Sequence, residues 1–252
     1  MNNTLYPIYI LWLRQIKRYF RSRSRIIGSL GQPLLFLLAL GYGLQGSFAG
    51  GAGGVNYFQF LAPGIISMAI LFTAIFSGIE VIWDRQFGFL KETLVAPVSR
   101  FSVMLGRTLG GATVATFQGI LVLIISMIVG FRPELSMIIP AIIYMLLIAL
   151  LFTALGTAIA SILEDMQGFQ LIMNFLVMPL FFLSGALFPL DTAPKVLQGI
   201  AYINPLSYGV DALRATLGTA AHFGLWIDTS VLVLVTLAFI GAGAYLFSRI
   251  KI

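Results

Sequence analysis

The chain contains no cysteine and one histidine, His222, among its 252 residues. A disulfide framework, a thiolate metal site and a histidine-based metal cluster are therefore excluded. Charged residues make up 10% of the chain, whereas soluble domains carry about 25%. The motifs G-x-x-x-x-G-K-[ST], H-E-x-x-H and G-x-S-x-G do not occur either. The sequence thus shows no P-loop nucleotide site and no catalytic or metal site of its own.

Apolar residues take the place of charge. The chain is 59% hydrophobic, with a mean hydropathy of +0.99. A hydrocarbon core of about 30 Å needs about 20 apolar residues in a helix. We therefore predict an all-α integral membrane protein, a single transmembrane domain over residues 1–252. Its six predicted transmembrane helices are residues 26–45, 57–83, 103–130, 135–163, 169–188 and 225–248.

Lys and Arg residues are distributed unevenly between the two sides that these spans define. One side would hold 12 of the 15, namely Arg14, Lys17, Arg18, Arg21, Arg23, Arg25, Arg85, Lys91, Arg100, Arg107, Arg249 and Lys251. The other would hold Arg132, Lys195 and Arg214. The richer side is predicted to be cytoplasmic. We therefore expect a multi-pass protein of the plasma or inner membrane with both termini cytoplasmic, and no nucleic-acid partner.

Residues 4–25 are predicted to form an amphipathic helix at the membrane interface. Its apolar face is Leu5, Ile8, Tyr9, Trp12, Ile16, Tyr19 and Phe20, and its basic face is Arg14, Lys17, Arg18, Arg21 and Arg25. Ile10, Leu11 and Leu13 fall outside the apolar face. Two roles remain open for this helix: a plain lipid anchor, or an element that transmits motion from a cytosolic partner.

A small polar island interrupts the apolar runs at residues 84–107. It carries Asp84, Arg85, Lys91, Glu92, Arg100 and Arg107, in a chain where charge is scarce. We predict a cytosolic segment over residues 84–102 at which a partner docks. Apolar residues among these charges, such as Phe87, Leu90 and Leu94, favour docking over a solvated loop.

The segment 189–224 is longer than a connector needs to be. Asn204-Pro205 is a favourable helix start, and it precedes a helical stripe of Leu206, Val210, Leu213 and Leu217. We predict an external re-entrant or interfacial helical hairpin buried against protein, with Asp211 and Arg214 elsewhere on the helix. The alternative is a surface helix on the outer leaflet. The Gly-rich residues 46–56 are expected to be a flexible connector.

Two of the spans carry Met and Phe residues suited to bulky amphipathic molecules. They are Met68, Phe72 and Phe76 in the second span, and Met173, Met178, Phe181 and Phe182 in the fifth. Ordinary helix packing or exposure to lipid is the alternative for each of them. The amides Gln32, Gln118 and Asn174 are interpreted as interhelical hydrogen-bond partners. Because the prediction places no charge at mid-membrane, transport against a gradient would need energy from a partner.

The order of these features, together with four motifs, resembles the type-2 ABC exporter permeases of the daunorubicin-resistance, nodulation-factor and polysaccharide-exporter kind. The motifs are QFLAPGI, FGFLKETLVAPVSR, FLSGALFPLDTAP and INPLSYGVDALR. The resemblance implies a homodimer of six-span subunits in membrane lipid, each paired with a separate ABC ATPase subunit, two copies in all. ATP and Mg would be bound by that ATPase, so the chain would not be an enzyme by itself.

The resemblance also implies roles for particular residues. Residues 88–95 would form the coupling helix, and the coupling residues are Phe87, Gly88, Phe89, Leu90, Lys91, Glu92, Thr93, Leu94, Val95 and Pro97. The connecting helix would use Arg14, Lys17, Arg18 and Arg21. Arg85, Arg100 and Arg107 are interpreted as topology signals, and Glu80 is expected to pair with Arg85 or with the basic helix. The substrate pathway would involve Met68, Phe72, Phe76, Asn174, Met178, Phe181 and Phe182.

The function that follows is the permease subunit of an ATP-driven exporter working by alternating access. Its substrate would be hydrophobic or amphipathic (a drug, lipid, glycolipid or polysaccharide), taken from the cytoplasm or inner leaflet. A secondary transporter or channel not coupled to ATP is the alternative, and an intramembrane enzyme is a third class. A secondary transporter would need ionisable groups at mid-membrane, and an intramembrane enzyme would need a catalytic pair within the spans. The sequence indicates neither.

Overall fold

The computed structural model describes residues 5–43, 57–89, 98–219 and 221–248, and every regular element in these ranges is a helix. The elements are α1 (Leu5–Arg21), α2 (Arg23–Gly43), α4 (Tyr57–Phe76), α5 (Ile79–Gln86), α7 (Arg100–Val129), η1 (Leu135–Met137), α8 (Ile138–Ile162), α9 (Met166–Phe182), η2 (Leu190–Thr192), α10 (Lys195–Ile203), α11 (Pro205–Thr216) and α12 (Leu225–Ser248).

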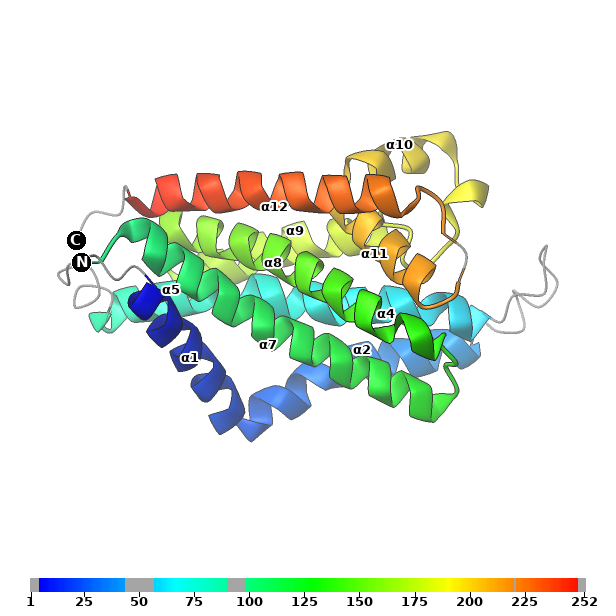
Figure 1. Cartoon of the computed structure of the whole chain (residues 1–252), viewed down its shortest axis with the longest axis horizontal. Coiled ribbons are helices and arrows are strands. Elements are labelled where there is room, and N and C mark those ends of the chain that lie inside the picture. The colour runs from blue at the N-terminus through cyan, green and yellow to red at the C-terminus, as the bar shows by residue number, and fades with distance from the viewer. Residues whose placement is uncertain (1–4, 44–56, 90–97, 220, 249–252) are drawn as a thin grey trace.

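The long helices run lengthwise beside one another, and the short ones gather at the two ends (Figure 1). α1 crosses α7 obliquely at the end where α5 and the end of α12 lie, whereas α10 and α11 occupy the opposite end. α4 lies innermost, since most of its residues are buried and it contacts α2, α7, α8, α9 and α11. The apolar core is therefore built around α4.

Five helical stretches are long and apolar enough to cross a membrane: Ile26–Gly43, Tyr57–Gln86, Arg100–Val129, Leu135–Ile162 and Leu225–Ser248. The remaining predicted span, residues 169–188, is the shorter helix α9 of 17 residues. At 1.5 Å per residue α9 is about 26 Å long, somewhat less than a hydrocarbon core of about 30 Å. The all-helical membrane fold is confirmed, and the count of six spans stays a prediction.

α9 ends at Phe182 because the backbone beyond it makes other hydrogen bonds. The Ser184 hydroxyl donates to the Phe181 carbonyl oxygen, and Gly185 adopts a φ of 75°. The carbonyl oxygens of Gly185 and Ala186 accept from the Arg214 guanidinium of α11. Residues 183–188, which the prediction placed within a span, therefore turn toward the α10–α11 end of the bundle.

A break at Ser77 and Gly78 divides the second predicted span into α4 and α5. The Ser77 hydroxyl donates to the Ala74 carbonyl oxygen, and the Gly78 N–H donates to that of Ile75. A Cβ on Gly78 would overlap the Gly156 carbonyl of α8, and a Cβ on Gly156 would overlap the Ile75 carbonyl. The two backbones touch at this point, which only glycine permits.

Several predicted boundaries differ from the observed ones. The amphipathic helix, predicted over residues 4–25, ends at Arg21, and Arg23 already belongs to α2. The second span continues to Gln86, and the third begins at Arg100, where the Ser99 hydroxyl caps the helix by accepting from the Ser102 N–H at 3.0 Å. Both described ends of the polar island are therefore helical.

α11 begins as predicted, since the Asn204 side chain accepts from the Leu206 N–H at 3.0 Å and Pro205 follows the cap. The helix packs against α4, α8 and α12. The predicted stripe is buried, and so are Asp211 and Arg214, which the pattern had placed elsewhere on the helix. Nearly every side of α11 is thus enclosed by protein.

Candidate functional site

The centre of the candidate site is the carboxylate of Asp84, near the end of α5. Its Oδ2 lies 2.6 Å from Nη2 of Arg107 on α7, and its Oδ1 lies 2.9 Å from Nη2 of Arg14 on α1. Arg18 approaches the same Oδ1 at 3.6 Å. The side chains of Asp84 and Arg107 are 3% and 4% exposed, so this pair is buried. One carboxylate therefore joins three helices.

Glu80 extends this cluster by one helical turn. Its Oε2 lies 3.3 Å from Nη1 of Arg18, so the predicted pairing of Glu80 with the basic helix is confirmed. Arg14 also stands over the ring of Phe89, at 5.7 Å from the ring centroid. We call Arg14, Arg18, Glu80, Asp84 and Arg107 the arginine–carboxylate cluster.

Arg107 and Arg85 were interpreted as topology signals, and for both the structure adds a specific contact. Arg107 is buried in the cluster, where a topology charge would be solvated. Arg85 donates to the carbonyl oxygens of Ser161 and Leu163, at 2.8 and 3.0 Å, where α8 ends. These carbonyls lack helical partners, so a guanidinium there satisfies them. α5 is consequently fixed to α8 as well as to α1 and α7.

α1 packs on α7 along a face that coincides only in part with the predicted one, since it includes Ile8, Trp12 and Tyr19. Gly106 and Gly110 of α7 let Ile8, Leu11 and Gln15 approach closely. Gln15 is buried, whereas Leu5, Tyr9 and Phe20 of the predicted apolar face are exposed. Leu11 fell outside the predicted face but belongs to the contact, because Gly106 has no side chain and leaves room for it.

Two hydrogen bonds fasten α1 to α7 further along. The Trp12 indole N–H donates to the Thr113 hydroxyl at 3.0 Å, and the Tyr19 hydroxyl donates to Oε1 of Gln118 at 2.6 Å. The interpretation of Gln118 as an interhelical hydrogen-bond partner is therefore confirmed. Buried polar bonds of this kind fix the register of one helix on another.

Of the predicted coupling residues, Phe87, Gly88 and Phe89 are described, and residues 90–97 lie outside the described part of the chain. Phe87 ends α5, with its side chain 65% exposed. Gly88 follows with a φ of 80°, which favours glycine. Phe89 is 47% exposed and lies under Arg14. Two large aromatic side chains thus project next to the arginine–carboxylate cluster.

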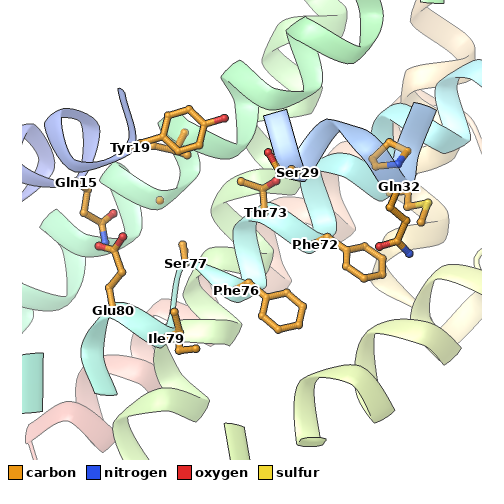
Figure 2. Close-up of a pocket in the computed structure, with 15 residues that line it drawn as sticks. Gln15, Tyr19, Ser29, Gln32, Phe72, Thr73, Phe76, Ser77, Ile79 and Glu80 are labelled. Carbon is orange, nitrogen blue, oxygen red and sulfur yellow. The ribbon is translucent and has the colours of Figure 1, made fainter. Parts of the chain in front are cut away.

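A cavity of about 270 Å³ adjoins the cluster between α1, α2, α4, α5 and α7. Figure 2 shows Phe72, Phe76 and Gln32 around this cavity, with Gln15 and Glu80 at its other end. The predicted pathway residues of the second span, Met68, Phe72 and Phe76, all line it. Figure 2 also shows that α1 and α2 supply much of the wall, which the pathway prediction did not include.

The pathway residues predicted on the fifth span lie on α9, away from this cavity. Asn174, Met178 and Phe182 are exposed, while Phe181 is buried with its ring edge-on to Phe36 of α2. Phe169, near the start of α9, contacts the ring of Phe76 edge-on. Within one chain the second-span and fifth-span sets therefore form two separate surfaces.

At the opposite end of the bundle lies a second polar group that the sequence patterns did not indicate. Both carboxylate oxygens of Asp211 accept backbone N–H groups, from His222 at 2.6 Å and from Phe223 at 2.7 Å. Arg214 stands 3.8 Å from the Phe60 ring centroid, and burial lowers the pKa of its guanidinium to about 10, partly offset by Asp211. Asp228 of α12 is also fully buried. These contacts hold α11, its following loop and residues 185–186 together.

His222, the one histidine of the chain, also belongs to this end of the bundle. Its Nδ1 lies 2.6 Å from Oδ1 of Asp191 in η2, so it links two parts of the external segment. In the described part of the chain no cluster of three or more His, Asp or Glu residues is arranged to hold a metal. The contacts of Asp211 and His222 thus join α11, the loop after it and η2.

Comparison with known proteins shows which family the chain belongs to. The sequence model described as ABC-2 type transporter matches residues 6–217. Nodulation protein J of Rhizobium leguminosarum bv. trifolii is 30% identical over 208 residues, which cover 82% of this chain and 76% of that protein. The putative transport permease ycf38 of Pyropia yezoensis is 32% identical over 222 residues, 84% of this chain and 74% of that protein.

The inner membrane transport permease YadH of Escherichia coli K12 is 28% identical over 207 residues, 81% of this chain and 80% of that protein. The match to the family extends from α1 through α11, and so includes the arginine–carboxylate cluster, the cavity and the external helices. On this evidence the chain is a member of the ABC-2 type transporter family, the membrane permeases of ABC exporters.

Proposed function

We propose that this chain is the membrane subunit of an ATP-driven exporter and that it receives mechanical work through the arginine–carboxylate cluster. A separate ABC ATPase, present in two copies and carrying ATP and Mg, would dock on the polar island. Two copies of the permease would assemble, with both termini cytoplasmic. The cargo would be hydrophobic or amphipathic.

The single observation that carries the proposal is the position of Asp84. It lies in the last turn of α5, the helix that leads into the predicted coupling segment, and its carboxylate binds α1 and α7 at the same time. A displacement of α5 would therefore move α1 and the start of α7 with it. Interfaces of this kind are bistable and not continuously deformable, so a small push is transmitted as a step.

The break at Gly78 gives that displacement a pivot. α5 is short, and it meets α8 through Gly78 on Gly156 and through Arg85 on the end of α8. The cavity lies directly against the break, because Phe76, Ser77 and Ile79 all line it. Motion of α5 against α4 would therefore change the shape of the cavity.

A path between two copies is supported by the exposed surface of α9. Leu171, Phe175, Met178 and Phe182 are exposed on this helix although all are large and apolar. In a six-span subunit such a surface faces lipid or a second copy. Asn174 lies on the same surface, which suits a lining that is not wholly apolar.

The test of the proposal is to introduce charge at the exposed aromatic side chains. Phe87→Asp together with Phe89→Asp is expected to reduce co-purification of the partner ATPase at least tenfold. The reason is that two apolar contacts, each contributing roughly 1.5–3 kcal/mol when buried, would be lost. The same variant should lose stimulation of ATP hydrolysis in proteoliposomes.

The matched control is Val196→Asp on α10. Val196 is 74% exposed and belongs to the external segment, so the substitution adds charge at the opposite end of the bundle. It should leave ATPase binding unchanged. Equal binding by the double variant and the wild type, with both proteins folded, would remove the docking site from α5 and the polar island.

A further inference from the structure

The cavity beside the arginine–carboxylate cluster has a size that limits what it can hold. Its volume is about 270 Å³, whereas pockets for drug-sized ligands have volumes of roughly 300–1,000 Å³. A whole amphipathic molecule would therefore not fit in it. The cavity is large enough for one part of such a molecule.

The charge of the lining restricts that part further. Among the described lining residues, Glu80 is the only charged side chain, and its carboxylate is paired with Arg18 at 3.3 Å. An anionic group would meet Glu80 at close range, and a cation would have to compete with Arg18 for it. Burial of an unpaired ion is costly, so the lining favours an uncharged group.

Hydrogen-bonding capacity is nevertheless abundant. Gln32 and Thr73 have no side-chain hydrogen bond to any other residue that the structure describes. The hydroxyls of Ser29 and Ser77 donate to carbonyl oxygens of their own segments, at 3.0 and 2.6 Å, which leaves their oxygens able to accept. The lining therefore offers both donors and acceptors to a guest rich in hydroxyl or amide groups.

Two stacked aromatic rings accompany these polar groups. The rings of Phe72 and Phe76 lie 6.3 Å apart with 17° between their planes, and Met68 continues the same face. Figure 2 shows Gln32 and both rings pointing to the same side of α4. Polar groups and aromatic rings in one lining are suited to a guest that is itself polar at its rim and apolar on its face.

The cavity reaches the surface along α2. Gly28 and Gln32 line it and are both exposed, and only 17% of the α2 span Ile26–Gly43 is buried. In a membrane that surface would face acyl chains. A tail attached to a guest in the cavity would therefore leave it between α2 and α4 without entering water.

We infer that this cavity receives the uncharged head group of an amphipathic molecule, with hydroxyl or amide groups bound by Gln32, Thr73 and the serines, while its tail stays in lipid beside α2. The inference rests on the proposed export function and gives that function a substrate class. It places an entry site on α1, α2 and α4, apart from the exposed α9 surface.

The experiment uses three photoreactive probes that share one diazirine-bearing alkyl chain and differ in the head: glucose, sulfate or trimethylammonium. The full-length protein in lipid nanodiscs is irradiated with each probe, and labelled peptides are identified by mass spectrometry. The glucose-headed probe is expected to label peptides from α2 and α4 and to be displaced by unlabelled alkyl glucoside. Equal labelling by all three heads, or preference for a charged head, would overturn the inference.

Variants locate the site. Gln32→Leu combined with Thr73→Val should lower labelling by the glucose probe roughly tenfold, from the loss of two hydrogen bonds. The matched control is Thr116→Val on α7, because the Thr116 hydroxyl bonds to its own helix and does not line the cavity. Unchanged labelling in the double variant would place the guest elsewhere.

The design separates this inference from the export function, because labelling needs neither ATP nor a partner. Selective labelling without ATP-dependent export in proteoliposomes would leave the binding site standing and contradict the proposed function. Export of a neutral amphipathic molecule without selective labelling at α2 and α4 would support the proposed function and contradict the binding site.

Discussion

Replacing Arg107 with methionine removes the guanidinium from the buried half of the arginine–carboxylate cluster and keeps much of its aliphatic stem. Asp84 would then be a carboxylate with 3% side-chain exposure that has lost its closest partner, at 2.6 Å. Breaking a buried pair in this way costs about 3–5 kcal/mol. The remaining partners soften the loss, because Arg14 and Arg18 still approach Asp84 at 2.9 and 3.6 Å.

Those two arginines are each 35% exposed, so each pair is worth at most about 1 kcal/mol. We therefore expect Arg107→Met to lower the free energy of unfolding by about 2–4 kcal/mol. The assay is equilibrium unfolding in mixed micelles, followed by tryptophan fluorescence. Trp12 on α1 and Trp83 on α5 lie on helices that the cluster joins, so their emission reports its loss.

A double-mutant cycle tests the pair itself. Asp84→Asn with Arg107→Met should cost less than the sum of the single changes by at least about 1 kcal/mol, because the second substitution removes the charge that the first left unpaired. Arg132→Met, at an exposed position at the other end of α7, is the matched control. If Arg107→Met costs no more than this control, or if the two changes in the cycle add, the pair does not hold α5 to α7.

Three further expectations follow from other contacts. Gly78→Ala should lower the free energy of unfolding by about 1–3 kcal/mol, because its Cβ would overlap the Gly156 carbonyl. The control Gly199→Ala on α10, which has open space around it, should be neutral or stabilising. Equal effects of the two substitutions would contradict the close contact between α8 and Gly78. Asp211→Ala should raise amide hydrogen exchange at His222 and Phe223 at least tenfold, since both N–H groups donate to that carboxylate, and unchanged exchange would rule the contact out. Arg85→Leu should lower the free energy of chemical unfolding by about 1–3 kcal/mol, because it leaves the Ser161 and Leu163 carbonyl oxygens unpaired. A decrease as small as that caused by Arg132→Met would show that this contact does not stabilise the fold.

Much of the fold was predictable from hydropathy and from local helix signals. Apolar runs of span length located five long helices, because lipid as a solvent demands apolar surface over a fixed thickness. Asn204-Pro205 located the start of α11, because a cap and a proline at the first turn act locally. The pairing of Glu80 with the basic helix was also predictable, since few carboxylates exist in the chain to pair with its arginines.

What the sequence patterns missed depends on contacts between distant residues. Arg107 was interpreted as a topology charge because the sequence does not show that it contacts Asp84, which lies 23 residues away along the chain. Leu11 and Gln15 contact α7 because Gly106 and Gly110 of that helix admit them, so the pattern within α1 showed only part of the contact face. The break at Gly78 likewise depends on Gly156 of α8. The cavity, whose wall combines five helices, was predicted only in the part that α4 supplies.

The most direct measurement is a cross-link from the exposed end of α5 to the partner ATPase. Because the chain has no cysteine, Phe87→Cys creates a single site for a maleimide-benzophenone reagent. We predict a photo-cross-link to the ATPase subunit whose yield changes between nucleotide-free and ATP-bound complexes, and no such product from Val196→Cys. A reagent at position 87 that reacts with lipid alone, or that cross-links no better than one at position 196, would contradict coupling through α5.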